Sequence, residues 1–104
     1  MKNITVAEMA RILQENPAAQ FIDVREPEEY AEVRAAGTTN IPMSGIIGRL
    51  QELDLSQEVY LICQAGGRSA QVGEYLQEAV GAEQVTNVTG GTAEWMAQGL
   101  PSEK

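Results

Sequence analysis

Short apolar runs alternate with amphipathic stretches along the whole chain, and this alternation limits the fold more than any other feature. Apolar runs at 21–24, 59–62 and 85–88 have the length of buried strands, and apolar residues recur at helical spacing between them. Strands that alternate with helices form βαβ units with parallel strands. The run at 59–62 has no polar alternation, as expected for a central strand covered on both faces. The pattern therefore predicts an α/β fold with a parallel sheet.

Cap and breaker residues divide the chain into helical segments. Thr5 followed by Glu8 is a capping-box pattern, which predicts a helix that ends at Asn16-Pro17. A last helix is expected after Gly90-Gly91, with Trp95 and Met96 pointing inward. The other helical segments are predicted over residues 27–30, 46–53 and 69–80, and an extended segment over 37–43.

Composition narrows the classes of function. Acidic residues outnumber basic ones 15 to 7, and the net charge of −8 argues against nucleic acid and anionic membranes as partners. No apolar run approaches the ~20 residues of a membrane helix, and the first residues lack the apolar core of a signal peptide. Because the chain has one cysteine, it cannot form an internal disulfide, and because it has no histidine, it lacks the usual metal-ligand sets. We expect one cytoplasmic domain over residues 1–104, monomeric and without a cofactor.

The segment from Cys63 to Ser69 carries the strongest functional signal. It contains the only cysteine, and it lies between the second apolar run and the helical segment that follows. Ligands of parallel sheets bind beyond the carboxyl ends of the strands, which is where Cys63 falls. The backbone amides of this segment have no obligatory partner in a strand. Gly66 and Gly67 permit positive φ angles, which would let these amides converge on an anion.

The same donors would stabilise a thiolate. Cysteine pKa values fall below ~8.5 near converging amides, a helix N-terminus or an arginine. Arg68 is the only cation between Gln51 and Glu103, and its guanidinium fork can bind an oxyanion through two hydrogen bonds. Since the chain has no histidine, activation of Cys63 as a nucleophile must come from backbone amides and Arg68. The predicted substrate-binding residues are Gln64, Ala65, Gly66, Gly67, Arg68 and Ser69.

A purely structural role for Cys63 is the main alternative to this interpretation. A free cysteine often serves as a small apolar core residue, and two glycines often make only a turn. A strand-terminal cysteine alone would leave the two interpretations roughly balanced. Gly-Gly-Arg at fixed offsets, followed by a helix, favours the reactive thiol.

Two other groups of residues lie next to predicted strand ends. Asp23 and Arg25 are expected to bind neighbouring loop amides and each other rather than a substrate. Gly90-Gly91 is expected to let its own loop approach the cysteine loop closely. Asp23 and Arg25 are therefore predicted to be structural, and only the Gly90-Gly91 loop is predicted to lie against the cysteine loop.

Four ordered blocks of the chain resemble the signatures of the rhodanese-like sulfurtransferase family. Together they extend over nearly the whole chain, and their order makes the match specific although each block alone is weak. One departure is visible, because Val33-Arg34-Ala35 stands where the family commonly has Gly-His-Ile. The blocks are the segment 21–30, the segment 37–42, the loop 63–69 and the segment 90–101.

The resemblance implies a small, mainly parallel five-stranded sheet flanked by helices on both faces. It also implies thiosulfate sulfurtransferase activity, in which Cys63 takes a sulfur atom from thiosulfate or a similar anionic donor and holds it as a persulfide. Cyanide or a thiol then removes the sulfur, and the thiol can belong to a thioredoxin-like or other sulfur-acceptor protein. Gln64 and Ala65 are neutral, whereas some thiosulfate-using relatives carry cations in this loop.

Two other functions stay open. Cysteine phosphatases and arsenate reductases also hold an anion between a cysteine and an arginine, but five residues separate the two, whereas four separate Cys63 from Arg68. A shorter loop makes a smaller cradle, which suits a sulfur atom better than a tetrahedral phosphate. The second alternative is a non-enzymatic sulfur carrier or interaction module of the same fold, because fold does not determine function.

Overall fold

A five-stranded parallel sheet forms the centre of the computed structural model, which describes all 104 residues. Its order is β1-β6-β5-β2-β4, and every neighbouring pair is parallel. The predicted α/β fold is therefore confirmed. The strands are β1 (Lys2–Ile4), β2 (Gln20–Asp23), β4 (Thr39–Asn40), β5 (Val59–Ile62) and β6 (Val85–Val88). A separate antiparallel pair joins β3 (Arg34–Ala35) to β7 (Ser102–Glu103).

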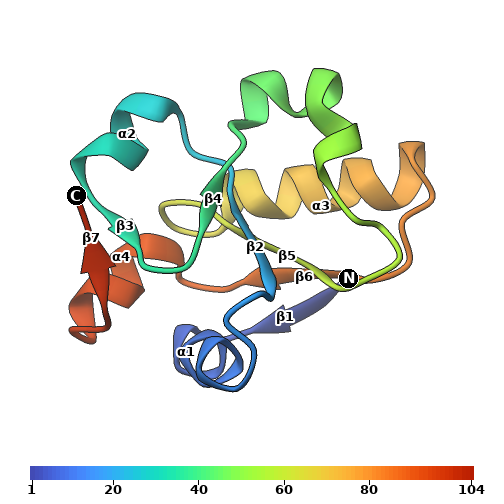
Figure 1. Cartoon of the computed structure of the whole chain (residues 1–104). Helices are drawn as coiled ribbons and strands as arrows, with labels where there is room; N and C mark the ends of the chain where they lie inside the picture. Colours follow the sequence, from blue (N-terminus) through green and yellow to red (C-terminus); the bar gives the residue numbers. More distant parts are fainter.

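Helices cover both faces of this sheet (Figure 1). One face carries α1 (Val6–Glu15) and α4 (Gly91–Ala97), and the other carries η1 (Met43–Glu52) and α3 (Gly67–Ala79). A short helix, α2 (Pro27–Glu32), follows β2 and leads into β3. No helix is long and apolar enough to cross a lipid bilayer.

The central strand β5 contributes side chains to two apolar clusters, one on each face of the sheet. Its Val59 and Leu61 side chains pack with α3 and η1, while Ile62 packs on the other face with Trp95 of α4 and Met9 of α1. This division follows from the pleat, because successive side chains of a strand point to opposite faces. The unbroken apolar run of β5 thus reflects burial on both sides, as its sequence predicts.

The first helix begins as its capping box predicts. The backbone amide of Glu8 donates to Thr5 Oγ1 over 3.2 Å, and the amide of Thr5 donates to Glu8 Oε1 over 3.0 Å. These bonds satisfy amides that a helix N-terminus otherwise leaves free. The helix ends at Asn16, whose amide donates to Ile12 O.

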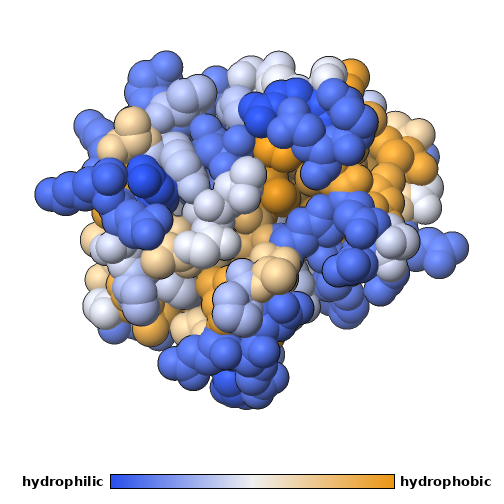
Figure 2. Space-filling model, viewed as in Figure 1, coloured by the Kyte–Doolittle hydropathy of each residue, from blue (hydrophilic) through white to orange (hydrophobic).

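The segment 46–53 differs from the regular helix that its apolar spacing predicts. It forms the 3₁₀ helix η1, interrupted at Arg49, whose φ of −126° and ψ of 19° are not helical. Gly45 and Gly48 weaken a regular helix here, because glycine loses more backbone entropy than other residues. Ile46 is buried, but Ile47 is 67% exposed. Apolar side chains therefore gather at the surface beside η1 (Figure 2).

Two further details differ from the sequence predictions. The edge strand β1 was not expected, because Lys2–Ile4 is short and only partly apolar, and it is recognisable only through its pairing with β6. In α4, Trp95 is buried as predicted, but Met96 is 41% exposed. Consecutive residues of a helix lie about 100° apart, so a seven-residue helix on this sheet buries only one of the two.

Candidate active site

Cys63 lies immediately after the central strand β5, at the carboxyl edge of the sheet. The residue is only 1% exposed, so its thiol sits at the bottom of the loop that connects β5 to α3. Gly66 is the N-cap of α3 and has a φ of 112°, which residues with a side chain rarely adopt. Gly67 does not use the positive φ that its sequence allows, and it starts the helix two residues before the predicted position.

Backbone amides point at the sulfur of Cys63. The amide of Gly66 donates to Sγ over 3.0 Å. Burial by itself raises the pKa of Cys63, but hydrogen bonds from the Ser69 hydroxyl and from the amides of Ser69, Gly66 and Ala65 outweigh it. The pKa of Cys63 is therefore lower than that of an ordinary cysteine, as the loop's composition predicts.

The Ser69 hydroxyl has one proton and three possible acceptors. Its Oγ lies 3.3 Å from Cys63 Sγ, 3.2 Å from Gly66 O and 2.5 Å from Asn87 Oδ1. In the shortest of these bonds, the Ser69 hydroxyl donates its proton to Asn87 Oδ1. A protonated Cys63 thiol would therefore donate to Ser69 Oγ. When the thiol ionises, the hydroxyl must turn its proton toward the sulfur. Asn87 thus competes with the thiolate for this proton.

Ser69→Ala is expected to raise the pKa of Cys63, because the thiolate loses its hydroxyl donor. A bond to a charged group contributes about 1.5–3 kcal/mol, so alkylation at neutral pH should slow about tenfold or more. The measurement is the rate of alkylation by iodoacetamide against pH, whose inflection should move to higher pH. Ser69→Thr keeps a hydroxyl and should behave like the parent chain. An unchanged inflection in Ser69→Ala would show that the amides alone stabilise the thiolate.

The start of α4 holds the cysteine loop from the other side. The Thr92 amide donates to Cys63 O over 2.8 Å, and the Ala93 amide donates to Gln64 O over 3.0 Å. A Cβ at Gly91 would lie only 2.4 Å from Cys63 O, so only glycine allows this approach. The predicted contact between the Gly90-Gly91 loop and the cysteine loop is therefore present.

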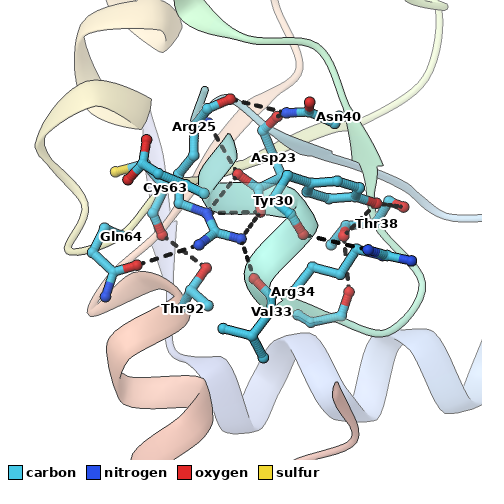
Figure 3. Close-up of polar contacts among 12 residues, drawn as sticks. Asp23, Arg25, Tyr30, Val33, Arg34, Thr38, Asn40, Cys63, Gln64 and Thr92 are labelled. Carbon is cyan, nitrogen blue, oxygen red and sulfur yellow. Dashed lines mark hydrogen bonds and ion pairs between the residues drawn. The ribbon is translucent and has the colours of Figure 1, made fainter. Parts of the chain in front are cut away.

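Arg25, a buried arginine that follows β2, contacts the cysteine loop through Gln64 (Figure 3). Arg25 donates to both carboxylate oxygens of Asp23, with Nη2 2.9 Å from Oδ2, and to Val33 O over 2.8 Å. Its Nη1 donates to Gln64 Oε1 over 3.4 Å, although Gln64, a predicted substrate-binding residue, is exposed. Asn40 Nδ2 donates to the carbonyls of Asp23 and Arg25. Asp23 and Arg25 thus bind each other and the backbone, in agreement with their predicted structural role.

The guanidinium fork of Arg68, which is predicted to bind a donor oxyanion, holds a carboxylate of the chain itself in this structure. Nη1 donates to Glu29 Oε1 over 2.7 Å and Nη2 to Glu29 Oε2 over 2.9 Å. Arg68 holds the pKa of Glu29 well down, to about 2, and Glu29 in turn raises the pKa of Arg68. The guanidinium therefore does not present a free fork to a donor oxyanion in this structure. The lowered pKa of Cys63 comes instead from hydrogen bonds with Ser69, Gly66 and Ala65.

Two contacts of this site had not been identified from the sequence. Asn87 reaches Ser69 from the neighbouring strand β6, and its only signal is a polar residue inside a buried strand. Glu29 stands among several acidic residues of α2, and nothing local marks it as the partner of Arg68. No cluster of three or more acidic or cysteine side chains could hold a metal ion. A cavity of about 290 Å³ lies away from Cys63, between α1, α4 and the segments 36–37 and 100–101.

The chain belongs to the rhodanese-like domain family, whose pattern matches residues 5–98. It is 33% identical over 101 residues to a Bacillus subtilis protein named "Putative sulfurtransferase YtwF", covering 97% of this chain and 96% of that one. The crystal structure of SSP1007 from Staphylococcus saprophyticus superposes with a TM-score of 0.81 at 39% identity, covering 97% and 99% of the two chains. The crystal structure of a rhodanese-like domain protein from Staphylococcus aureus gives a TM-score of 0.82 at 36% identity, with 91% of each chain covered.

Other relatives in this family are longer proteins. The chain spans 60% of the length of the uncharacterized protein YqhL of Bacillus subtilis, to which it is 38% identical over 77 residues. It spans 40% of another Bacillus subtilis protein, named "Putative sulfur carrier protein YrkF", at 35% identity over 75 residues. The relatives of this chain therefore include one protein named as a putative sulfurtransferase and one named as a putative sulfur carrier.

Proposed function

We propose that the chain is a sulfurtransferase that carries a sulfane sulfur as a persulfide on Cys63. The observation that supports this best is the geometry around Sγ: a lone, recessed thiol with a lowered pKa, facing the amide of Gly66 at 3.0 Å. The amides of the loop stabilise a thiolate before the reaction and the terminal sulfur of the persulfide after it. The short loop, with four residues between Cys63 and Arg68, suits one additional sulfur atom better than a tetrahedral phosphate.

The reaction has two displacement steps. With thiosulfate as donor, the Cys63 thiolate attacks the outer sulfur, the sulfur–sulfur bond breaks, and sulfite leaves with the electron pair. In the second step, cyanide or a thiolate attacks the terminal sulfur of the persulfide and releases the Cys63 thiolate. The products are thiocyanate or the persulfide of the acceptor. A thioredoxin-like or other sulfur-acceptor protein is a suitable thiol partner in a reduced, cytoplasmic environment.

A dedicated sulfur carrier is the second candidate function. The name of the relative YrkF favours it, and the recessed position of Cys63 would protect a stored persulfide. A carrier would load sulfur from a donor but transfer it rapidly only to its own acceptor. A cysteine phosphatase or arsenate reductase is less well supported, because four residues separate Cys63 from Arg68 and the Arg68 fork holds Glu29.

Incubation with thiosulfate followed by cyanide tests the proposed function. We expect the intact mass to increase by one sulfur atom and cyanide to reverse the increase with release of thiocyanate in equal amount. Loading without turnover by cyanide or small thiols would favour the carrier. Hydrolysis of an aryl phosphate with no change of mass after any sulfur donor would contradict both.

A further inference from the structure

Two arginines, Arg25 and Arg68, contact or belong to the cysteine loop, and each forms an ion pair with a carboxylate. Arg25 contacts Gln64, but its side chain is only 2% exposed and is bound to Asp23. Arg68 is the only cation between residues 51 and 103, and both of its terminal nitrogens are bound to Glu29. The loop is thus flanked by positive charges that are already neutralised.

The carboxylate of Glu29 is held in place by more than Arg68. Its Oε1 also accepts the backbone amide of Glu26 over 3.0 Å, in the capping box of α2. The side chains of Arg68 and Glu29 are 31% and 36% exposed, so the pair stands at the surface. Glu29 keeps its charge at neutral pH, since its pKa is about 2. The Glu29 carboxylate therefore fills the position at the Arg68 guanidinium that a donor oxyanion would take.

The ion pair of Arg68 and Glu29 makes the binding free energy of a sulfur donor depend on the donor's charge. A donor oxyanion gains the Arg68 fork only by breaking two charge-assisted hydrogen bonds and by bringing its own charge close to Glu29. The energy of a donor in the potential of Glu29 is proportional to the donor's charge. Thiosulfate, with two negative charges, is therefore disfavoured twice as strongly in free energy as a donor with one.

Building on the proposed sulfur transfer, we propose that Glu29 is a specificity-determining residue that selects donors of low negative charge, the hydropersulfides of thiols, over thiosulfate. In this reaction the Cys63 thiolate attacks the terminal sulfur of R–S–S–H. The sulfur–sulfur bond of the donor breaks, a new one forms to Sγ, and R–S⁻ leaves with the electron pair. The products are a Cys63 hydropersulfide and a thiolate, with no net oxidation or reduction.

Glu29→Gln tests the proposal cleanly, because glutamine keeps the capping-box bond to the Glu26 amide but removes the charge. Two donors that differ in charge serve as probes, namely thiosulfate with two negative charges and benzenethiosulfonate with one. We expect kcat/KM to rise about threefold for benzenethiosulfonate and, since the effect on the logarithm doubles with charge, about tenfold for thiosulfate. The persulfide of N-acetylcysteine methyl ester should change no more than benzenethiosulfonate.

Two further variants assign the effect to the ion pair. Glu28→Gln removes the same charge from the same helix without touching Arg68, and both donors should then react as in the parent chain. Adding Arg68→Met to Glu29→Gln should cancel the gain for thiosulfate, because no fork is left to bind it. Circular dichroism and thermal unfolding of each variant report whether the fold is retained.

The outcomes separate this proposal from the proposed function. Equal changes for both donors, or no change, in a folded Glu29→Gln chain would overturn the role of Glu29 while sulfur loading itself persists. Equal gains in Glu28→Gln would also overturn it, since net charge alone would then explain the effect. Failure of the parent chain to take sulfur from all three donors would instead contradict the proposed function.

Discussion

Cys63→Ser is expected to abolish sulfur loading and sulfur transfer together. A serine hydroxyl has nearly the same size as the thiol, but it is not ionised at neutral pH and cannot form a persulfide. Thiocyanate production from thiosulfate and cyanide should fall below detection. The parent chain should gain one sulfur atom in intact mass, and the variant none. Because Cys63 is the only cysteine, no other thiol of the chain can contribute to either signal.

The fold of this variant provides the control. Sγ contacts the Gly66 amide and the Ser69 hydroxyl, and a serine Oγ can accept from the same donors, so thermal unfolding should change little. A folded Cys63→Ser chain that still produces thiocyanate would show that the nucleophile is elsewhere. The same loss in Cys63→Ala would confirm that the thiol, rather than a polar atom at this position, is required.

Asp23→Ala is expected to destabilise the fold strongly. It leaves Arg25 charged and only 2% exposed, without the carboxylate that binds its guanidinium. Breaking a buried pair by removing one partner costs about 3–5 kcal/mol, a large part of the roughly 5–15 kcal/mol that stabilises a small domain. Urea unfolding, followed by circular dichroism, should show the loss as a lower midpoint. Cysteine alkylation should become faster as the loop loosens.

An exposed ion pair gives the matched comparison. Arg49 and Glu52 are 39% and 42% exposed, and they bind each other through two hydrogen bonds. Because exposed pairs contribute little to stability, Glu52→Ala should shift the urea midpoint much less than Asp23→Ala does. Adding Arg25→Met to Asp23→Ala should recover part of the loss, since the uncompensated charge disappears. Equal costs for Asp23→Ala and Glu52→Ala would contradict the buried role of the Arg25–Asp23 pair.

The parts predicted from the sequence are those that local patterns determine. The apolar runs of β2, β5 and β6, the capping box of α1 and the approach of Gly91 to the cysteine loop follow from neighbouring residues. The placement of Cys63 between strand and helix is local as well. The number of strands and the coverage of both faces came from the resemblance to the rhodanese-like family and are confirmed.

The parts that could not be predicted depend on residues far apart in the chain. Glu29 and Arg68 are 39 positions apart, and only the folded sheet brings α2 next to the start of α3. Asn87 meets Ser69 because β6 lies beside β5. For η1, the apolar period indicated a regular helix, but the segment is a 3₁₀ helix interrupted at Arg49, in a stretch that two glycines weaken. Local patterns therefore indicate the nucleophile, while its electrostatic surroundings require the structure.

The most direct measurement of the central claim is peptide mapping by mass spectrometry after incubation with a sulfur donor. The chain is treated with thiosulfate and, separately, with the persulfide of N-acetylcysteine methyl ester, then alkylated and cleaved. We predict one additional sulfur atom on the peptide that contains Cys63, lost again after cyanide. No additional sulfur on that peptide with either donor, in a folded chain whose Cys63 still reacts with iodoacetamide, would contradict the account.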